Sequence, residues 1–198
     1  MTDTEIVQLV IAGNRDAFRP LAEKYKGMVF RTSMGFVHNK EDAEDITQDV
    51  LVSVYQSLGK FKGQSSFSTW VYRIALNASL NFVRKKSRHS ILQRFETLLG
   101  FEKKNEIQQI ESGYFNPEQI LTNKERRASI HRALDLLPEN QCIAFTLSKY
   151  DDLPQREIAQ IMNLTEGAVE ALLQRAKANL QKKLSDFYNK KTNTHRKI

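Results

Sequence analysis

The stretch that decides the fold of this chain is residues 155–184, which read QREIAQIMNLTEGAVEALLQRAKANLQKKL. Its first eight residues place two isoleucines, an alanine and a methionine on one face of a short helix, directly after Pro154. Asn163 stands where the chain must turn sharply, and asparagine tolerates a left-handed backbone better than most residues. Thr165 then caps a second helix, whose first turn carries Glu166 at the positive end of the helix dipole.

The second helix has a buried stripe and an exposed face. Its apolar residues recur at i, i+4, i+7 and i+11, and small Ala159 lies where the two helices cross, which predicts a helix-turn-helix. An ordinary αα-hairpin in a bundle is the alternative, but the turn chemistry and the stripe favour DNA binding. The outward residues suit a reader of the major groove, and together with the cap they are Thr165, Glu166, Glu170, Ala171, Gln174, Arg175 and Lys177.

Charge is unevenly distributed along the 198 residues, whose formal net charge is +7. Residues 1–90 hold 13 basic and 9 acidic side chains, residues 91–125 hold 4 and 6, and residues 126–198 hold 13 and 8. Two basic ends around an acidic middle indicate two separate contacts with a polyanion, with a solvated basic surface as the alternative. At this length two small domains are expected.

Several classes of protein are excluded by the residue inventory. The single cysteine, Cys142, excludes an internal disulfide and a cysteine-rich metal site, and the four histidines show no metal-ligand spacing. No apolar run reaches the length of a membrane span, and the N-terminus lacks a signal-peptide pattern. We therefore expect a soluble, cytoplasmic protein without direct membrane insertion, with no metal, no cofactor and no small-molecule substrate.

The first helices are set by local signals. Thr2 and Glu5 have the spacing of a capping box, and Gly13 suits the exit from the first helix. Pro20 intrudes on the helical pattern of residues 18–36, so it either lies in a first turn or bends the helix.

An acidic helix face follows at residues 41–50. Its outward side chains are Glu41, Asp42, Glu44, Asp45, Gln48 and Asp49. Five acids exceed what the helix dipole requires, and a binder of polyanions would not aim this face at DNA. A basic protein partner is one explanation, and a solvated face is the other.

Residues 60–88 combine a loop with a helix that has two distinct faces. One face carries Phe67, Val71, Ile74, Ala78 and Phe82, as expected for a core. The other carries Trp70, Arg73, Asn77, Asn81 and Arg84 and continues into Lys85, Lys86 and Arg88. Aromatic, amide and basic groups on one face suit nucleic acid with partly unstacked bases. Trp70 can also be a core residue that shapes such a surface.

These pieces together resemble the bacterial extracytoplasmic-function sigma factors, the alternative sigma factors of RNA polymerase. In the first half the matching segments are AFRPLAEKY (17–25), DAEDITQDV (42–50) and FKGQSSFSTWVYRIALN (61–77), followed by RKKSR (84–88). In the second half LDLLPENQ (134–141) and REIAQIMNLTEGAVEALLQRAKANL (156–180) match the same group. The match covers about four-fifths of the chain, in the order and spacing of the family. One segment alone is a weak signal, but both domains on one short chain are specific.

The resemblance implies an all-α fold with two small helical domains, a flexible linker, and a helix-turn-helix in the C-terminal domain. Residues 1–88 would bind core polymerase and recognise and melt the −10 element, residues 89–115 would be the linker, residues 116–188 would read the −35 element, and residues 189–198 would form a basic tail. The polymerase-binding residues would be Asp42, Asp45, Gln48 and Asp49. A base of the non-template strand would enter a pocket around Gly63, Ser65, Ser66 and Phe67, and unstacking it costs a few kcal/mol.

The family also implies core RNA polymerase, promoter DNA and an anti-sigma factor as partners. Many relatives carry a basic residue and then serine where this chain has Glu170 and Ala171. The −35 sequence read by relatives therefore does not transfer to this chain. Arg175 matches a position where the family places a DNA-contacting arginine, and Lys177 would meet phosphate.

Three functions from different classes follow as hypotheses. A sigma factor confers promoter-specific initiation on core polymerase, whereas a conventional helix-turn-helix regulator binds duplex DNA alone and leaves the acidic face and FSTWVYR unexplained. An enzyme acting on nucleic acid would need an acid/base or metal site, and the sequence shows no such constellation. We expect a sigma factor and no enzymatic activity.

Overall fold

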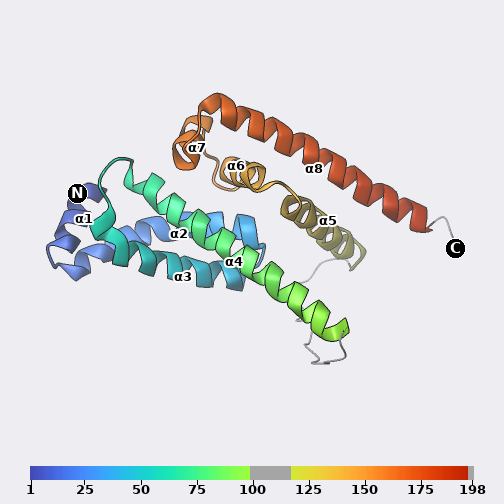
Figure 1. Cartoon of the computed structure of the whole chain (residues 1–198), viewed down its shortest axis with the longest axis horizontal. Coiled ribbons are helices and arrows are strands. Elements are labelled where there is room, and N and C mark those ends of the chain that lie inside the picture. Colours follow the sequence, from blue (N-terminus) through green and yellow to red (C-terminus); the bar gives the residue numbers. More distant parts are fainter. Residues whose placement is uncertain (99–116, 196–198) are drawn as a thin grey trace.

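The computed structural model describes residues 1–98 and 117–195, and it describes side chains for residues 1–87 and 126–185. Its helices in the first half are α1 (Asp3–Ile11), the 3₁₀ turn η1 (Arg15–Ala17), α2 (Phe18–Val37), α3 (Lys40–Ser57), the 3₁₀ turn η2 (Leu58–Lys60) and α4 (Phe67–Leu98). The second half contains α5 (Pro117–Asp135), α6 (Glu139–Lys149), α7 (Gln155–Met162) and α8 (Glu166–His195) (Figure 1). The described residues form helices and no strand, which confirms the all-α prediction. The expected linker is helical up to Leu98 and then lies outside the described residues.

The predicted N-terminal signals act as expected. The Glu5 amide donates to Thr2 Oγ1 at 3.3 Å and the Thr2 amide donates to Glu5 Oε2 at 2.8 Å, which is the predicted capping box. Pro20 lies in the first turn of α2, because that helix begins at Phe18. Proline is tolerated there, since the first amides of a helix have no partner within it.

Helices α2, α3 and α4 form the core of the N-terminal half. On α3, Val50 and Val54 are fully buried on the side opposite the predicted acidic face. On α4 the buried hydrophobic residues are Phe67, Val71, Tyr72, Ala75 and Leu76, whereas the predicted core residues Ile74, Ala78 and Phe82 are only partly buried. The prediction for α4 was too narrow because this helix packs against α2 and α3 on one side and against α7 on another.

In the C-terminal half α6 and α7 pack against α8, and α6 reaches as far as Asn179. A smaller apolar cluster of Ala133, Leu134, Leu137, Ala176 and Leu180 joins α5 to α8. Ile130 of α5 lies outside this cluster and is 45% exposed. In the part of the chain that the structure describes, no helix has both the length and the apolar character needed to cross a membrane.

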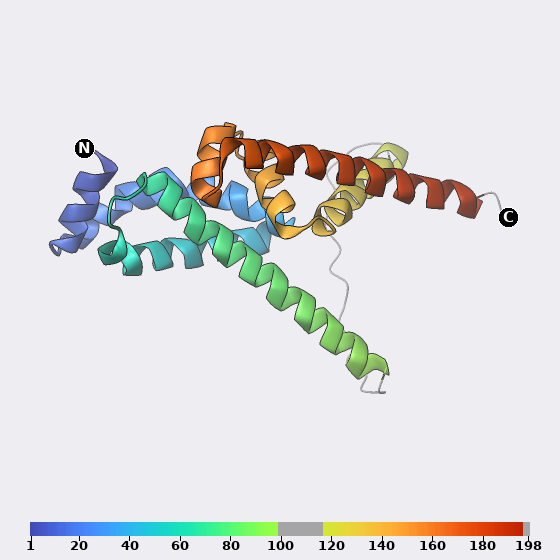
Figure 2. The ribbon, with the colours of Figure 1, turned by 45° about the horizontal axis from the view of Figure 1, so that its top comes forward.

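The two halves share one hydrophobic core. The main apolar cluster runs from residues of α2 and α4 into Ile143, Leu147 and Ile158 of α6 and α7. Gly35 of α2 allows the approach, because a Cβ atom placed on it would lie only 2.3 Å from Thr146 Cγ2. Helices α6 and α7 lie along α2 and the first half of α4, and the far ends of α4 and α8 diverge (Figures 1 and 2).

Ionisable groups lie in the same contact between the halves. Thr32 Oγ1 of α2 donates to Asp151 Oδ2 at 2.8 Å, and Arg31 Nε lies 3.7 Å from Asp151 Oδ1. Burial raises the pKa of Asp151 to about 6. The His38 and His131 rings stack at 4.1 Å, and burial lowers the pKa of His131.

Candidate nucleic-acid and protein interfaces

The acidic face of α3 is exposed as the sequence predicts, with one exception. Asp45, Gln48 and Asp49 point to solvent along the first half of the helix. Asp42 is partly buried, since Lys86 Nζ of α4 donates to its Oδ2 at 2.6 Å. Two side chains predicted to bind different partners are therefore bonded to each other, and the free acidic face is centred on Asp45, Gln48 and Asp49.

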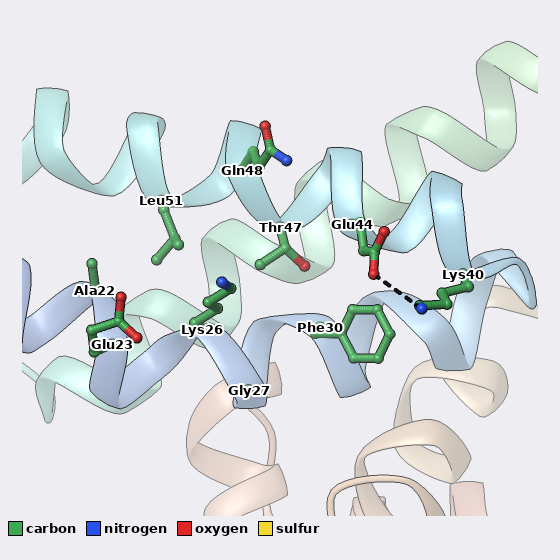
Figure 3. A pocket seen from close by; sticks show the side chains of 10 residues that line it. All are labelled: Ala22, Glu23, Lys26, Gly27, Phe30, Lys40, Glu44, Thr47, Gln48 and Leu51. Carbon is green, nitrogen blue, oxygen red and sulfur yellow. Dashed lines mark ion pairs between the residues drawn. The ribbon is translucent and has the colours of Figure 1, made fainter.

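A groove of about 750 Å³ borders this face between α2 and α3. Thr47 and Leu51 of α3 face Lys26 of α2 across it, and the Phe30 ring of α2 lies near the ion pair of Lys40 and Glu44 (Figure 3). Gln48 is on its rim, so the groove and the acidic face form one continuous surface. The complete lining is Ala22, Glu23, Lys26, Gly27, Phe30, Lys40, Glu44, Thr47, Gln48 and Leu51.

The loop before α4 is built around Ser66. Ser66 Oγ accepts from the Thr69 amide at 3.1 Å and lies within hydrogen-bond distance of the Ser68 and Thr69 hydroxyls. Ser66 therefore caps α4. Gly63 has φ +69°, a conformation that glycine adopts without strain. Ser65 Oγ donates to the Ser66 carbonyl at 3.3 Å, so both hydroxyls of the predicted base pocket are bonded, one within the loop and the other to the first turn of α4.

An aromatic cluster packs where the loop joins α4. Phe67 is buried, and its ring lies 5.4 Å from Tyr25 and 5.3 Å from Phe61. Trp70 is partly buried and lies 5.4 Å from Phe61 and 5.6 Å from Phe67. Trp70 is thus a core residue at the edge of the loop, and Phe67 supports the loop instead of facing solvent.

On the polar face of α4 some side chains are exposed and others bond to α6 or α7. Asn77, Asn81 and Lys85 are exposed. Arg73 donates to two backbone carbonyls of α7, and Arg84 Nη2 lies 2.5 Å from Glu139 Oε2 of α6. The side chain of Arg88 lies outside the described residues. Two arginines of the predicted −10 face are therefore in contact with the C-terminal half of the chain.

The helix-turn-helix forms as predicted. Asn163 adopts φ 55° and ψ 47°, the left-handed conformation that ends α7. The Ala168 amide donates to Thr165 Oγ1 at 3.2 Å, so Thr165 caps α8. Ala159 and Val169 are buried where the two helices meet.

The outer face of α8 is available for a ligand. Glu166, Glu170, Gln174, Arg175 and Lys177 are exposed, and Ala171 is partly buried. Gln174 Nε2 donates to Glu170 Oε1 at 3.3 Å, which aligns an amide and a carboxylate one turn apart. Amide and carboxylate groups in the major groove read adenine and cytosine edges, respectively.

The sequence did not identify the residues of α2 that border the acidic face. Lys26 and Phe30 lie within the long helix α2, and no local sequence signal shows that they line the groove between α2 and α3. The contact of Gly35 with Thr146 has no sequence signal either, because the two residues are far apart in the chain.

The described side chains include no group of three or more histidine, cysteine, aspartate or glutamate residues placed to hold a metal ion. Cys142 is partly buried in α6, and burial raises the pKa of its thiol to about 11. A thiol with so high a pKa is a weak nucleophile at neutral pH.

Comparison with known proteins gives a family match for each half of the chain. The model of Sigma-70 region 2 matches residues 21–89, and the model of Sigma-70 region 4 matches residues 127–180. The chain is 32% identical over 184 residues to the RNA polymerase sigma-H factor of Pseudomonas aeruginosa, covering 92% of this chain and 93% of that protein. It is 30% identical over 186 residues to the ECF RNA polymerase sigma-E factor of Escherichia coli strain K12, covering 93% and 95%.

Solved structures share the fold. CnrH in complex with the cytosolic domain of CnrY superimposes with a TM-score of 0.63 at 21% identity, covering 93% of this chain and 97% of that one. The sigma factor RpoE from Bartonella quintana, in complex with the anti-sigma factor NepR, gives a TM-score of 0.55 at 19% identity, covering 85% and 96%. The helical architecture of both halves is therefore one already seen in experimental structures.

Proposed function

Because this chain belongs to the extracytoplasmic-function sigma factors, which direct bacterial core RNA polymerase to promoters, we propose how its surfaces divide that work. Residues 1–88 bind core polymerase and recognise and melt the −10 element. Residues 116–188 read the −35 element, residues 89–115 connect the two, and residues 189–198 are a basic tail. The observation that carries this division is that acidic, aromatic-basic and helix-turn-helix surfaces occupy three separate helices, α3, α4 and α8.

The acidic face of α3 is the proposed polymerase contact. Asp45, Gln48 and Asp49 are exposed side by side with the groove between α2 and α3. A carboxylate-rich rim beside a partly apolar groove suits a basic, amphipathic helix or loop of the larger protein. Asp42 contributes once its bond with Lys86 is exchanged for a contact with polymerase.

The loop 61–66 and the polar face of α4 are the proposed −10 contact. Gly63, Ser65 and Ser66 offer backbone and hydroxyl groups to an extruded base, and the Phe67–Trp70 cluster holds the loop in place. Asn77, Asn81 and Lys85 lie further along the helix, where they meet the bases and phosphates that follow. Melting is then driven by binding free energy, and we propose that the chain itself has no enzymatic activity.

The exposed face of α8 is the proposed −35 reader. Arg175 and Lys177 supply positive charge, and Glu170 with Gln174 supplies a carboxylate and an amide for base edges. Glu170 repels phosphate, so it lies over the groove floor, where it accepts from a cytosine amino group. This arrangement predicts a −35 sequence different from that of relatives with a basic residue at this position.

An anti-sigma factor is the proposed regulator, because the Bartonella quintana structure described above is a complex with an anti-sigma factor and the CnrH structure is a complex with the cytosolic domain of CnrY. We also propose that the protein acts in the cytoplasm, where core polymerase and promoters are found.

The test is run-off transcription with purified core polymerase over a library of genomic fragments. We expect transcripts that begin at a defined subset of fragments and that require the added protein. The −10 and −35 sequences then follow from the active fragments. A protein that binds duplex fragments equally well without polymerase, and yields no transcript with it, would be a conventional helix-turn-helix regulator.

A further inference from the structure

Helix α1 has no role in the function proposed above. The match to Sigma-70 region 2 begins at residue 21, beyond α1 and the turn η1. The first turn of α1 is nevertheless bonded to α2. Asp3 Oδ1 accepts from Lys24 Nζ at 2.6 Å, and Asp3 Oδ2 accepts from the hydroxyl of the buried Tyr25. Asp3 therefore joins α1 to the core of the N-terminal half.

Tyr25 connects this carboxylate with the loop before α4. Burial, followed by the bond to Asp3, raises the pKa of the Tyr25 hydroxyl, so the hydroxyl stays protonated and donates at neutral pH. The Tyr25 ring meets the buried Phe67 ring edge to face, with the ring centres 5.4 Å apart. The space around this contact, between α2, α3 and α4, is too small for a water molecule. In a core packed this closely, a shift of Tyr25 moves Phe67 as well.

Phe67 in turn contacts both ends of the loop 61–66. Its ring lies 5.3 Å from that of Phe61, the first residue of the loop, and its backbone begins α4, where the loop ends. The hydrogen bonds of Ser65 and Ser66 stay within the loop and the first turn of α4, so they fix the shape of the loop and not its place on the core. Helix α1 also packs against η2, directly before the loop. A continuous series of contacts therefore leads from Asp3 to the loop.

We propose that α1 positions the base-binding loop of the −10 contact, with Asp3 and Tyr25 as positioning residues that act through Phe67. This role rests on the proposed function, since it takes the loop 61–66 as the site that receives an extruded base. A loop that is held in its binding geometry before DNA arrives loses less conformational entropy on binding. Without the bond between Asp3 and Tyr25, the Phe67 ring has to be immobilised when the base binds, and binding of the base is weaker.

Binding of holoenzyme to a single-stranded −10 oligonucleotide, taken from a promoter that the protein transcribes, tests the proposal. An abasic site is placed at each position in turn, and the position at which it costs the wild type most affinity identifies the captured base. Tyr25→Phe and Asp3→Ala should each weaken binding of the intact oligonucleotide about three- to tenfold, as expected when one further side chain is immobilised on binding. Affinity for the oligonucleotide with that abasic site should remain that of the wild type, because the base that the loop positions is missing.

The abasic oligonucleotide separates positioning from stability. Wild-type affinity for it shows that a variant is folded and bound to core polymerase. Equal losses on the intact and the abasic oligonucleotide would assign the effect to folding or polymerase binding, and they overturn the proposal. Wild-type affinity of both variants for the intact oligonucleotide overturns it as well.

Two further variants test the path through Tyr25. Lys24→Ala removes the exposed partner of the same carboxylate and should keep wild-type affinity for both oligonucleotides. Asp3→Ala combined with Tyr25→Phe should lose no more affinity than either single variant, because both changes break the same bond. Additive losses in the double variant, or a loss with Lys24→Ala as large as that with Asp3→Ala, overturn this path.

Trp70 reports the support of the loop in the absence of DNA and polymerase. It is the single tryptophan, and its ring lies 5.6 Å from Phe67 and 5.4 Å from Phe61. In the free protein, Tyr25→Phe and Asp3→Ala should increase the quenching of its fluorescence by acrylamide, and Lys24→Ala should not. Unchanged quenching in the first two variants overturns the positioning role.

The two measurements also distinguish this role from the proposed function. If no abasic site costs the wild-type holoenzyme affinity, the loop receives no base, and the assignment of the −10 contact fails. Quenching of Trp70 then decides alone whether Asp3 and Tyr25 hold the loop in place.

Discussion

Asp151 brings a carboxylate into the contact between the two halves of the protein. Its side chain has no exposed surface, Thr32 Oγ1 donates to one oxygen, and Arg31 is the cation that faces the other at 3.7 Å. Among the described residues the second oxygen accepts no hydrogen bond. Burial outweighs these partners and raises the pKa of Asp151 to about 6.

We therefore predict a specific pH dependence for Asp151→Asn. The folded pKa is about 6 and the unfolded one about 3.9, so the folded state binds more protons between these values. The stabilisation from protonated Asp151 is complete below about pH 4 and is lost as the pH rises to about 6. Asparagine keeps an acceptor for Thr32, so the variant should gain on the wild type over this interval, by at most about 3 kcal/mol. Urea unfolding from pH 4 to 7.5 measures the difference.

Asp152→Asn, a matched change at the exposed neighbour, is the control for that comparison. A pH-dependent gain of equal size in this variant would assign the effect to the net charge of the loop. The charge of Asp152 contributes to the raised pKa of Asp151, so Asp152→Asn alone should give only a smaller gain.

Arg175 is the residue at which −35 recognition is best tested. It is exposed on α8, one residue before the buried Ala176, so its guanidinium is free to reach DNA. Arg175→Ala should weaken the binding of holoenzyme to a promoter by about 1–3 kcal/mol. Affinity for the same promoter with a scrambled −35 element should change little. Arg132→Ala, at an exposed arginine of α5, is the control, and equal losses in both variants would show only a general charge effect.

At the level of single elements, α3 serves the core and the surface at once. Its inner residues, such as Val50, are fully buried, and the opposite side is acidic and free. Because the acidic residues do not support the core, they can be changed without loss of folding. The inner residues of α3 therefore contribute to stability, and its acidic residues are available for binding a partner.

We predict that Asp45→Ala with Gln48→Ala weakens association with core polymerase. Loss of one charge and one amide at the centre of the face should lower the affinity about tenfold or more, as expected for central interface residues. The urea midpoint should stay within the error of the wild type. Gln8→Ala with Asp16→Ala removes the same groups from exposed sites near α1 and serves as the control. Unchanged polymerase affinity in the α3 variant would remove the assignment of this face.

At the level of the whole molecule, the shared core makes the two halves one cooperative unit in the free protein. Ile158 of α7 and Val71 of α4 belong to the same buried cluster, whereas Leu180 belongs to the separate cluster of α5 and α8. Truncation of Ile158 should therefore destabilise the N-terminal half, and truncation of Leu180 should destabilise it less.

The single tryptophan, Trp70, lies in the N-terminal half and reports this coupling. Ile158→Ala should cost about 2–5 kcal/mol and lower the urea midpoint of Trp70 fluorescence. Leu180→Ala, a change of similar size in the same C-terminal half, should shift the Trp70 midpoint less. Equal shifts in both variants would show that cooperativity does not run through the shared core.

Local chemistry in the sequence determined most of the elements of this protein. The capping box of Thr2 and Glu5, the left-handed turn at Asn163 and the cap at Thr165 join residues no more than four positions apart. The buried stripe of α8 and the acidic face of α3 follow from helical periodicity alone. Such signals involve residues that are close together along the chain, so they can be recognised from the sequence alone.

The tertiary structure alone decided which faces remain free. Arg73 meets carbonyls 87 and 88 residues away, and Thr32 meets Asp151 across 119 residues. The broad core face of α4 and the exposure of Ile130 depend in the same way on which helices pack beside them. A periodic pattern shows that a face is polar or apolar, but what covers it depends on contacts between distant segments, which sequence patterns do not encode locally.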